Sequence, residues 1–131
     1  MARHRQATPT EVEMEILQVL WENQQSTVRE VVDVLNQSRP RAYTSILSML
    51  NVMYDKGLVE REMRGRAHVY RARKSRESTL GGVIKDLLGR AFQGSTSSLI
   101  TQILEQSKPS AAELEEIRKT IEDWQDEETA E

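Results

Sequence analysis

The strongest constraint on the fold is a change in the spacing of apolar residues at Gly57. Before this glycine, apolar side chains recur every three or four residues, which is the period of a helix that buries one face. After it, two short runs at residues 58–63 and 67–72 flank an Arg-Gly-Arg turn at residues 64–66. Two extended runs around a glycine-centred turn are typical of a β-hairpin. The order therefore predicts helices followed by a hairpin.

Local signals mark the ends of three helices before the hairpin. Thr10 and Thr27 each stand three residues before a glutamate, which is the arrangement of a capping box. We expect the first helix at residues 11–23 and a second, shorter helix directly after Thr27. A third helix is expected at residues 42–56, because Gly57 can adopt the left-handed conformation that ends a helix.

The rest of the chain returns to a helical period. Apolar stripes lie within residues 80–92, 99–104 and 114–124, and a Gly-Ser-rich stretch and a Lys-Pro pair separate them. The last stripe is narrow, which is typical of helices that pair with one another. We expect the acidic tail at residues 126–131 to be frayed.

Three helices followed by a hairpin is the order of a winged helix-turn-helix. We therefore predict a mainly α fold with a small β-hairpin wing. Residues 1–76 are expected to form the winged helix-turn-helix domain, and residues 77–131 a helical dimerisation region with an acidic tail. The positions expected to pair with a second chain are Leu80, Ile84, Leu87, Leu88, Leu114, Ile117, Ile121 and Trp124.

Charge is distributed unevenly along the chain. The net charge is −3, yet residues 39–76 hold 10 Lys or Arg against 3 Asp or Glu, whereas residues 77–131 hold 5 against 12. A phosphate group responds to charges within about 8 Å at physiological salt. The local excess of cations therefore favours nucleic acid as a partner of the N-terminal half, in spite of the acidic chain as a whole.

The third helix has two faces. Its core-facing residues are expected to be Ile46, Leu50, Met53 and Tyr54. Its other face carries hydroxyl and amide groups, which can meet base edges in the major groove of DNA. Arginines precede this helix and flank the hairpin turn, where cations suit phosphates or the minor groove. The candidate DNA-binding residues are Arg39, Arg41, Tyr43, Thr44, Ser45, Ser48, Asn51, Arg64 and Arg66.

Two other classes of protein compete with this interpretation. A winged helix that binds protein would explain the fold and the apolar stripes, but not the basic cluster. An enzyme is disfavoured, because the chain has no cysteine and its histidines, His4 and His68, form no Ser-His-carboxylate pattern. No metal or cofactor motif is present, and no apolar run reaches the ~20 residues that span a bilayer. We expect a cytoplasmic, non-enzymatic protein without cofactor or metal.

Three segments carry a resemblance to a known family. They are residues 10–21, residues 42–61 with Ala-Tyr-Thr at the helix start and Lys-Gly-Leu-Val after it, and residues 64–70, Arg-Gly-Arg-Ala-His-Val-Tyr. Over about residues 8–125 the chain resembles the penicillinase repressor family, which includes the methicillin-resistance repressor. The resemblance implies a dimeric repressor whose winged helices bind a palindromic operator and whose C-terminal helices intertwine. It also implies induction by proteolysis, linked to a membrane metallopeptidase sensor.

The chain departs from that family in two places. The best-known members are cut at an Asn-Phe bond between the dimerisation helices, whereas residues 92–96 here read Phe-Gln-Gly-Ser-Thr. Copper-responsive relatives carry C-terminal cysteines, and this chain has none. Copper sensing is therefore disfavoured, and the signal for cleavage is absent.

Overall fold

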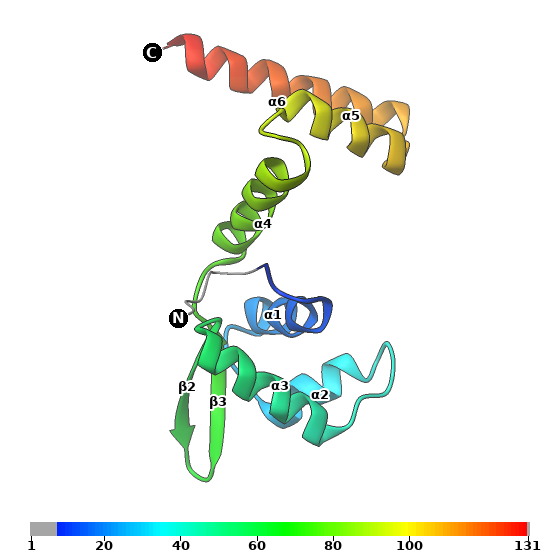
Figure 1. The fold of residues 1–131 in the computed structure, drawn as a ribbon. Helices are drawn as coiled ribbons and strands as arrows, with labels where there is room; N and C mark the ends of the chain where they lie inside the picture. Colours follow the sequence, from blue (N-terminus) through cyan, green and yellow to red (C-terminus); the bar gives the residue numbers. More distant parts are fainter. Residues whose placement is uncertain (1–7, 131) are drawn as a thin grey trace. The chain divides into compact units, whose positions relative to one another are not determined.

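The computed structural model describes residues 8–130, and Figure 1 shows their helices and strands. The chain divides into two compact units, Met1–Asp86 and Leu87–Glu131. The division falls inside α4 (Arg76–Ala91). Among residues 8–130, no helix combines the length and the apolar character needed to cross a bilayer.

The first unit contains three helices before its hairpin, namely α1 (Glu11–Asn23), α2 (Val28–Leu35) and α3 (Tyr43–Lys56). Thr10 and Thr27 cap α1 and α2 with the reciprocal hydrogen bonds of a capping box, as predicted. α3 differs, because its N-cap residue Ala42 provides no side-chain acceptor for the amides of the first turn. Gly57 ends α3 at φ +81°, and its amide donates to carbonyls of the last turn.

The same unit contains a three-stranded antiparallel sheet in the order β1-β3-β2, built from β1 (Ser26–Thr27), β2 (Val59–Arg64) and β3 (Ala67–Ala72). β2 and β3 form the predicted hairpin, and Gly65 takes φ +63° in its turn. β1 was not predicted, because two residues are too few to show alternation. Ser26 pairs with Tyr70 and Thr27 with Val69, so β1 ties the start of α2 to the hairpin.

The core of the first unit is mainly aliphatic. The predicted residues Ile46, Leu50 and Met53 are buried on the inner face of α3. β3 contributes Tyr70, which is fully buried. The remaining members of the core come from α1, α2 and β2 and are Ile16, Leu17, Val19, Leu20, Val28, Val31, Val32, Leu35 and Val59.

Tyr54 corrects the prediction for the inner face of α3. Its side chain is 41% exposed, although it was expected in the core. Tyr54 lies at the edge of the apolar stripe, and the guanidinium carbon of Arg61 lies 3.8 Å from the centre of its ring. A tyrosine can occupy such an edge because a cation covers its face while its hydroxyl stays in water.

After the hairpin the chain is helical, with α4 followed by α5 (Thr96–Ser107) and α6 (Ala111–Ala130). The prediction of a frayed tail is wrong for residues 126–130, which continue α6. The helix persists because residues 111–130 contain no glycine or proline and are rich in good helix formers. Residue 131 lies outside the described residues.

One carboxylate lies in the core of the first unit. Glu13 is 1% exposed, and it accepts the backbone N–H of Thr10 at 2.9 Å and the ammonium of Lys56 at 2.7 Å. This pair ties the first turn of α1 to the last turn of α3. Burial raises the pKa of Glu13, but the hydrogen bonds from Lys56 and Thr10 and the Lys56 charge outweigh it, so the pKa is lowered.

Because the folded-state pKa of Glu13 is lowered, its charged form stabilises the fold at neutral pH. We expect Glu13→Gln to lower the free energy of unfolding by about 1–3 kcal/mol at about pH 7, because an amide cannot neutralise Lys56. The difference should shrink near pH 3, because the wild-type carboxylate loses its contribution as the pH falls through its folded pKa. Urea unfolding at both pH values measures this.

Glu11→Gln is the matched control, since Glu11 is an exposed carboxylate in the same turn of α1. It should change the free energy of unfolding by less than about 0.5 kcal/mol. An equal loss of stability in Glu13→Gln at both pH values would contradict the contribution of the charge.

Candidate nucleic-acid interface

α3 exposes a polar face opposite its buried side chains. The helical period places these polar residues on one side of the helix, so burial of the apolar side fixes which of them face outward. Val52 is 47% exposed on the same side and adds an apolar group that the pattern did not single out. The predicted residues on this face, all of them exposed, are Thr44, Ser45, Ser48 and Asn51.

Two predicted arginines before α3 lie in different environments. Arg39 is exposed and forms no ion pair with any residue in 8–130. Arg41 is only 11% exposed, and its guanidinium lies 2.7 Å from a carboxylate oxygen of Glu15. Its backbone N–H donates to Oδ1 of Asn36 at 2.6 Å. Arg41 therefore anchors the loop before α3 to α1 and α2.

The N-terminus of α3 is open to an anion. Ala42 leaves the first amides of the helix without a side-chain cap, and helix N-termini attract negative groups. Tyr43 is exposed beside this end, with the guanidinium carbon of Arg29 5.0 Å from the centre of its ring. Arg29 belongs to α2 and was not predicted as a site residue, because in the sequence it is one of several polar residues expected on the solvent-exposed side of that helix.

The hairpin turn carries the other two predicted arginines. Arg66 is exposed and has no acidic partner within the described part of the chain. Arg64 lies 3.1 Å from a carboxylate oxygen of Glu62 and donates to Oε1 of Gln25 at 3.4 Å. The turn therefore presents one unpaired cation and one that is paired to its own strand.

Arg61 joins the wing to the exposed face of α3. Its Nη1 donates to Oδ1 of Asn51 at 3.0 Å while its guanidinium covers the Tyr54 ring. Arg61 was not predicted as a site residue. Strand alternation places the Arg61 side chain on the same side of β2 as the buried Val59. Arg61 is also opposite the buried Tyr70 in the register of β2 and β3, so its side chain projects from the face of the sheet that covers the core.

The fold separates the cations of residues 39–76 into two groups. Arg41, Lys56, Arg64 and Arg71 each form an ion pair with a glutamate. The second group forms no ion pair within residues 8–130, and a phosphate can therefore approach these cations without displacing a carboxylate. Its members are Arg39, Arg61, Arg66, Arg73, Lys74 and Arg76.

The histidines and carboxylates of the described residues form no metal-binding group. His68 lies on β3 with its ring edge-on to Tyr70, the ring centres 6.0 Å apart. His4 lies outside the described residues.

The C-terminal helices expose apolar side chains. Trp124 is 64% exposed, and α5 adds two exposed isoleucines, Ile100 and Ile103, that were not predicted. Such exposure is costly for large apolar groups and marks a contact surface when the groups are contiguous. The predicted pairing positions comprise the exposed Ile84, Leu87, Leu114, Ile121 and Trp124 and the half-buried Leu80, Leu88 and Ile117.

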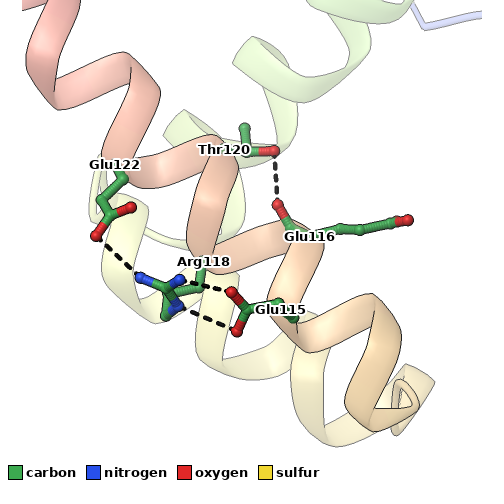
Figure 2. A network of polar contacts seen from close by, with 5 residues as sticks. All are labelled: Glu115, Glu116, Arg118, Thr120 and Glu122. Carbon is green, nitrogen blue, oxygen red and sulfur yellow. Dashed lines mark hydrogen bonds and ion pairs between the residues drawn. The ribbon is translucent and has the colours of Figure 1, made fainter.

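Arg118 binds two carboxylates along the polar side of α6 (Figure 2). It pairs with Glu115 in the preceding turn and with Glu122 in the next, at 2.9 Å. The hydrogen bond from Arg118 lowers the pKa of Glu115, and the bonds to Glu115 and Glu122 raise the pKa of Arg118. These exposed contacts support the helix and leave its apolar positions uncovered.

Three helices followed by a β-hairpin wing define the class of winged-helix proteins. The profile of the Penicillinase repressor family matches residues 9–123. The chain belongs to this family, as predicted from its sequence.

Individual relatives share less than a third of their aligned residues with this chain, but the alignments cover most of both proteins. The chain is 23% identical over 114 residues to the penicillinase repressor of Bacillus licheniformis, covering 87% of this chain and 89% of that protein. It is 27% identical over 113 residues to the transcriptional regulator BlaI of Mycobacterium tuberculosis, covering 85% and 80%. It is 18% identical over 109 residues to the methicillin resistance regulatory protein MecI of Mammaliicoccus sciuri, covering 83% and 89%.

The two arginines before α3 should differ in their effect on stability. We expect Arg41→Gln to lower the free energy of unfolding by about 1–3 kcal/mol, because it leaves the largely buried contact to Glu15 unmade. Arg39→Gln is the matched control and should stay within about 0.5 kcal/mol of wild type. Urea unfolding measures both. Equal stability of the two variants would show that the Arg41 pair does not anchor the loop.

Proposed function

We propose that this protein is a DNA-binding transcriptional repressor that binds a palindromic operator as a homodimer. The observation that carries the proposal is the exposed polar face of α3 with cations on both sides that form no ion pair within residues 8–130, namely Arg39 before the helix and Arg66 on the wing. The names of the relatives, which are repressors and regulatory proteins, support the same function.

In this proposal, α3 enters the major groove, because one helix fits its width of ~12 Å. Thr44, Ser45, Ser48 and Asn51 face base edges. Arg39, Tyr43 and the open N-terminus of α3 meet phosphates, which a helix end and a cation both favour. Arg41 does not contact DNA in this proposal, because its charge is paired with Glu15. It instead holds in place the loop that presents Arg39.

The salt dependence of DNA affinity tests whether the wing contacts phosphates. We expect the double variant Arg64→Ala plus Arg66→Ala to bind both an operator, selected from random duplexes by the wild type, and unselected duplex more weakly, by similar factors. The slope of log affinity against log salt should fall by about 0.9 for each lost phosphate contact. Fluorescence anisotropy with labelled duplexes at several salt concentrations measures both quantities.

Lys119→Ala on α6 is the control, because it removes one exposed cation outside the proposed interface. Unchanged affinity and slope in the double variant, with a normal circular dichroism spectrum, would remove the wing from the interface. If the wild type binds no selected duplex, the alternative is favoured, in which the winged helix binds a protein.

We propose the apolar positions of the C-terminal helices as the dimer contact. A narrow apolar seam on a single helix is marginal in water, whereas a second chain would bury it. Two linked winged helices gain effective concentration on two half-sites. A symmetric dimer reads a palindrome whose half-sites are separated by about one helical turn or a multiple of it.

Charged residues in the seam should separate the chains. We expect Ile117→Glu plus Ile121→Glu to sediment as a monomer and to lose most of its operator affinity. Lys119→Glu adds a negative charge on the polar side of the same helix and should remain a dimer. An unchanged dimer in the double variant, measured by sedimentation at the same concentration, would refute this contact.

We propose a cytoplasmic, non-enzymatic protein that needs no cofactor. As the resemblance implies, we propose that the protein is released from DNA by proteolysis linked to a membrane metallopeptidase sensor. Gln93 and Gly94 are exposed in the turn between α4 and α5, and exposed turns with small or polar residues are preferred sites of proteolytic cleavage. The cut would differ from the family's Asn-Phe bond, which this chain lacks.

A further inference from the structure

A contact between the wing and α3 orients one polar side chain of the exposed helix face. Nη1 of Arg61 lies 3.0 Å from Oδ1 of Asn51, and its guanidinium carbon lies 3.8 Å from the centre of the Tyr54 ring. Arg61 has no acidic partner in residues 8–130. The ring below the guanidinium and the amide oxygen at its edge therefore hold the side chain in place.

The chemistry of the two groups fixes how the amide of Asn51 is turned. A guanidinium has five N–H donors and no acceptor, so only the amide oxygen can face it. The Nδ2 group, with its two hydrogens, makes no hydrogen bond to any other described residue. Asn51 is exposed, and its two amide hydrogens are thus available to a ligand.

Bases differ in what they can offer to such an amide. Adenine presents an acceptor beside a donor in the major groove, and an unrestrained asparagine pairs with it through both its nitrogen and its oxygen. Guanine presents the two acceptors N7 and O6, whereas adenine and thymine each present one acceptor. An amide whose oxygen is held by Arg61 matches an edge of acceptors.

We infer that Arg61 is a positioning residue that makes Asn51 a hydrogen-bond donor toward DNA. The pair then selects guanine over adenine at one base pair of each half-site. This inference rests on the proposed function and adds to it a rule for one position of the operator.

The contact itself is tested in the full-length protein without DNA. Arg61→Lys keeps the charge but loses the planar fork that reaches both the ring and the amide. We expect the side-chain amide resonances of Asn51, assigned by their loss in Asn51→Ala, to shift in Arg61→Lys. Arg71→Lys is the matched control, because Arg71 pairs with Glu60 on the neighbouring strand. Unshifted resonances in Arg61→Lys would overturn the contact.

The base preference is tested with operator variants that carry each base in turn. Asn51→Ala identifies the position that Asn51 reads, as the one at which preference disappears. There we expect the wild type to favour guanine over adenine by about tenfold. Arg61→Lys should remove most of this preference while the salt slope stays the same, because the number of cations is unchanged. Arg71→Lys should retain the preference.

The outcomes separate this inference from the proposed function. A wild-type preference for adenine at that position, or a loss of affinity in Arg61→Lys that is equal for all bases, overturns the inference while operator binding stands. A wild type that binds no duplex selectively overturns the proposed function and the role of Asn51 with it.

Discussion

The burial of Ile46, Leu50 and Met53 sets the position of every other group on α3. A helix that turned by one residue would carry its hydroxyl groups into the core without hydrogen-bond partners, at a cost of about 1–3 kcal/mol for each group. The rotation of the helix is therefore fixed from the inside. Gly57 then starts the hairpin directly after the helix, so the wing and the polar face keep a constant spacing.

The features that were predictable from the sequence are those whose cause is local. Thr10, Thr27 and Gly57 determine helix ends through bonds within a few residues, and the hairpin follows from its own turn. β1 was missed because its two residues form a strand only where β3 offers an edge. Tyr54 was misplaced because its environment depends on Arg61, which arrives from another element.

The candidate site shows the same division between local and long-range causes. The polar face of α3 follows from helical spacing and was predicted. Which arginines are available to a ligand depends on pairs such as Arg41 with Glu15, 26 residues apart in the chain. A count of charges in a segment gives the sign of its field, whereas only the fold separates cations that anchor loops from cations that remain unpaired.

The exposed apolar side chains of α5 and α6 have a consequence for how sharply such a protein responds to its own abundance. If two chains must meet before operator DNA is held, the active species follows mass action between single chains. While most chains are single, halving their concentration lowers the amount of dimer about fourfold. Modest degradation of the chain would then lower the occupancy of the operator by a larger factor than it lowers the total concentration of the protein.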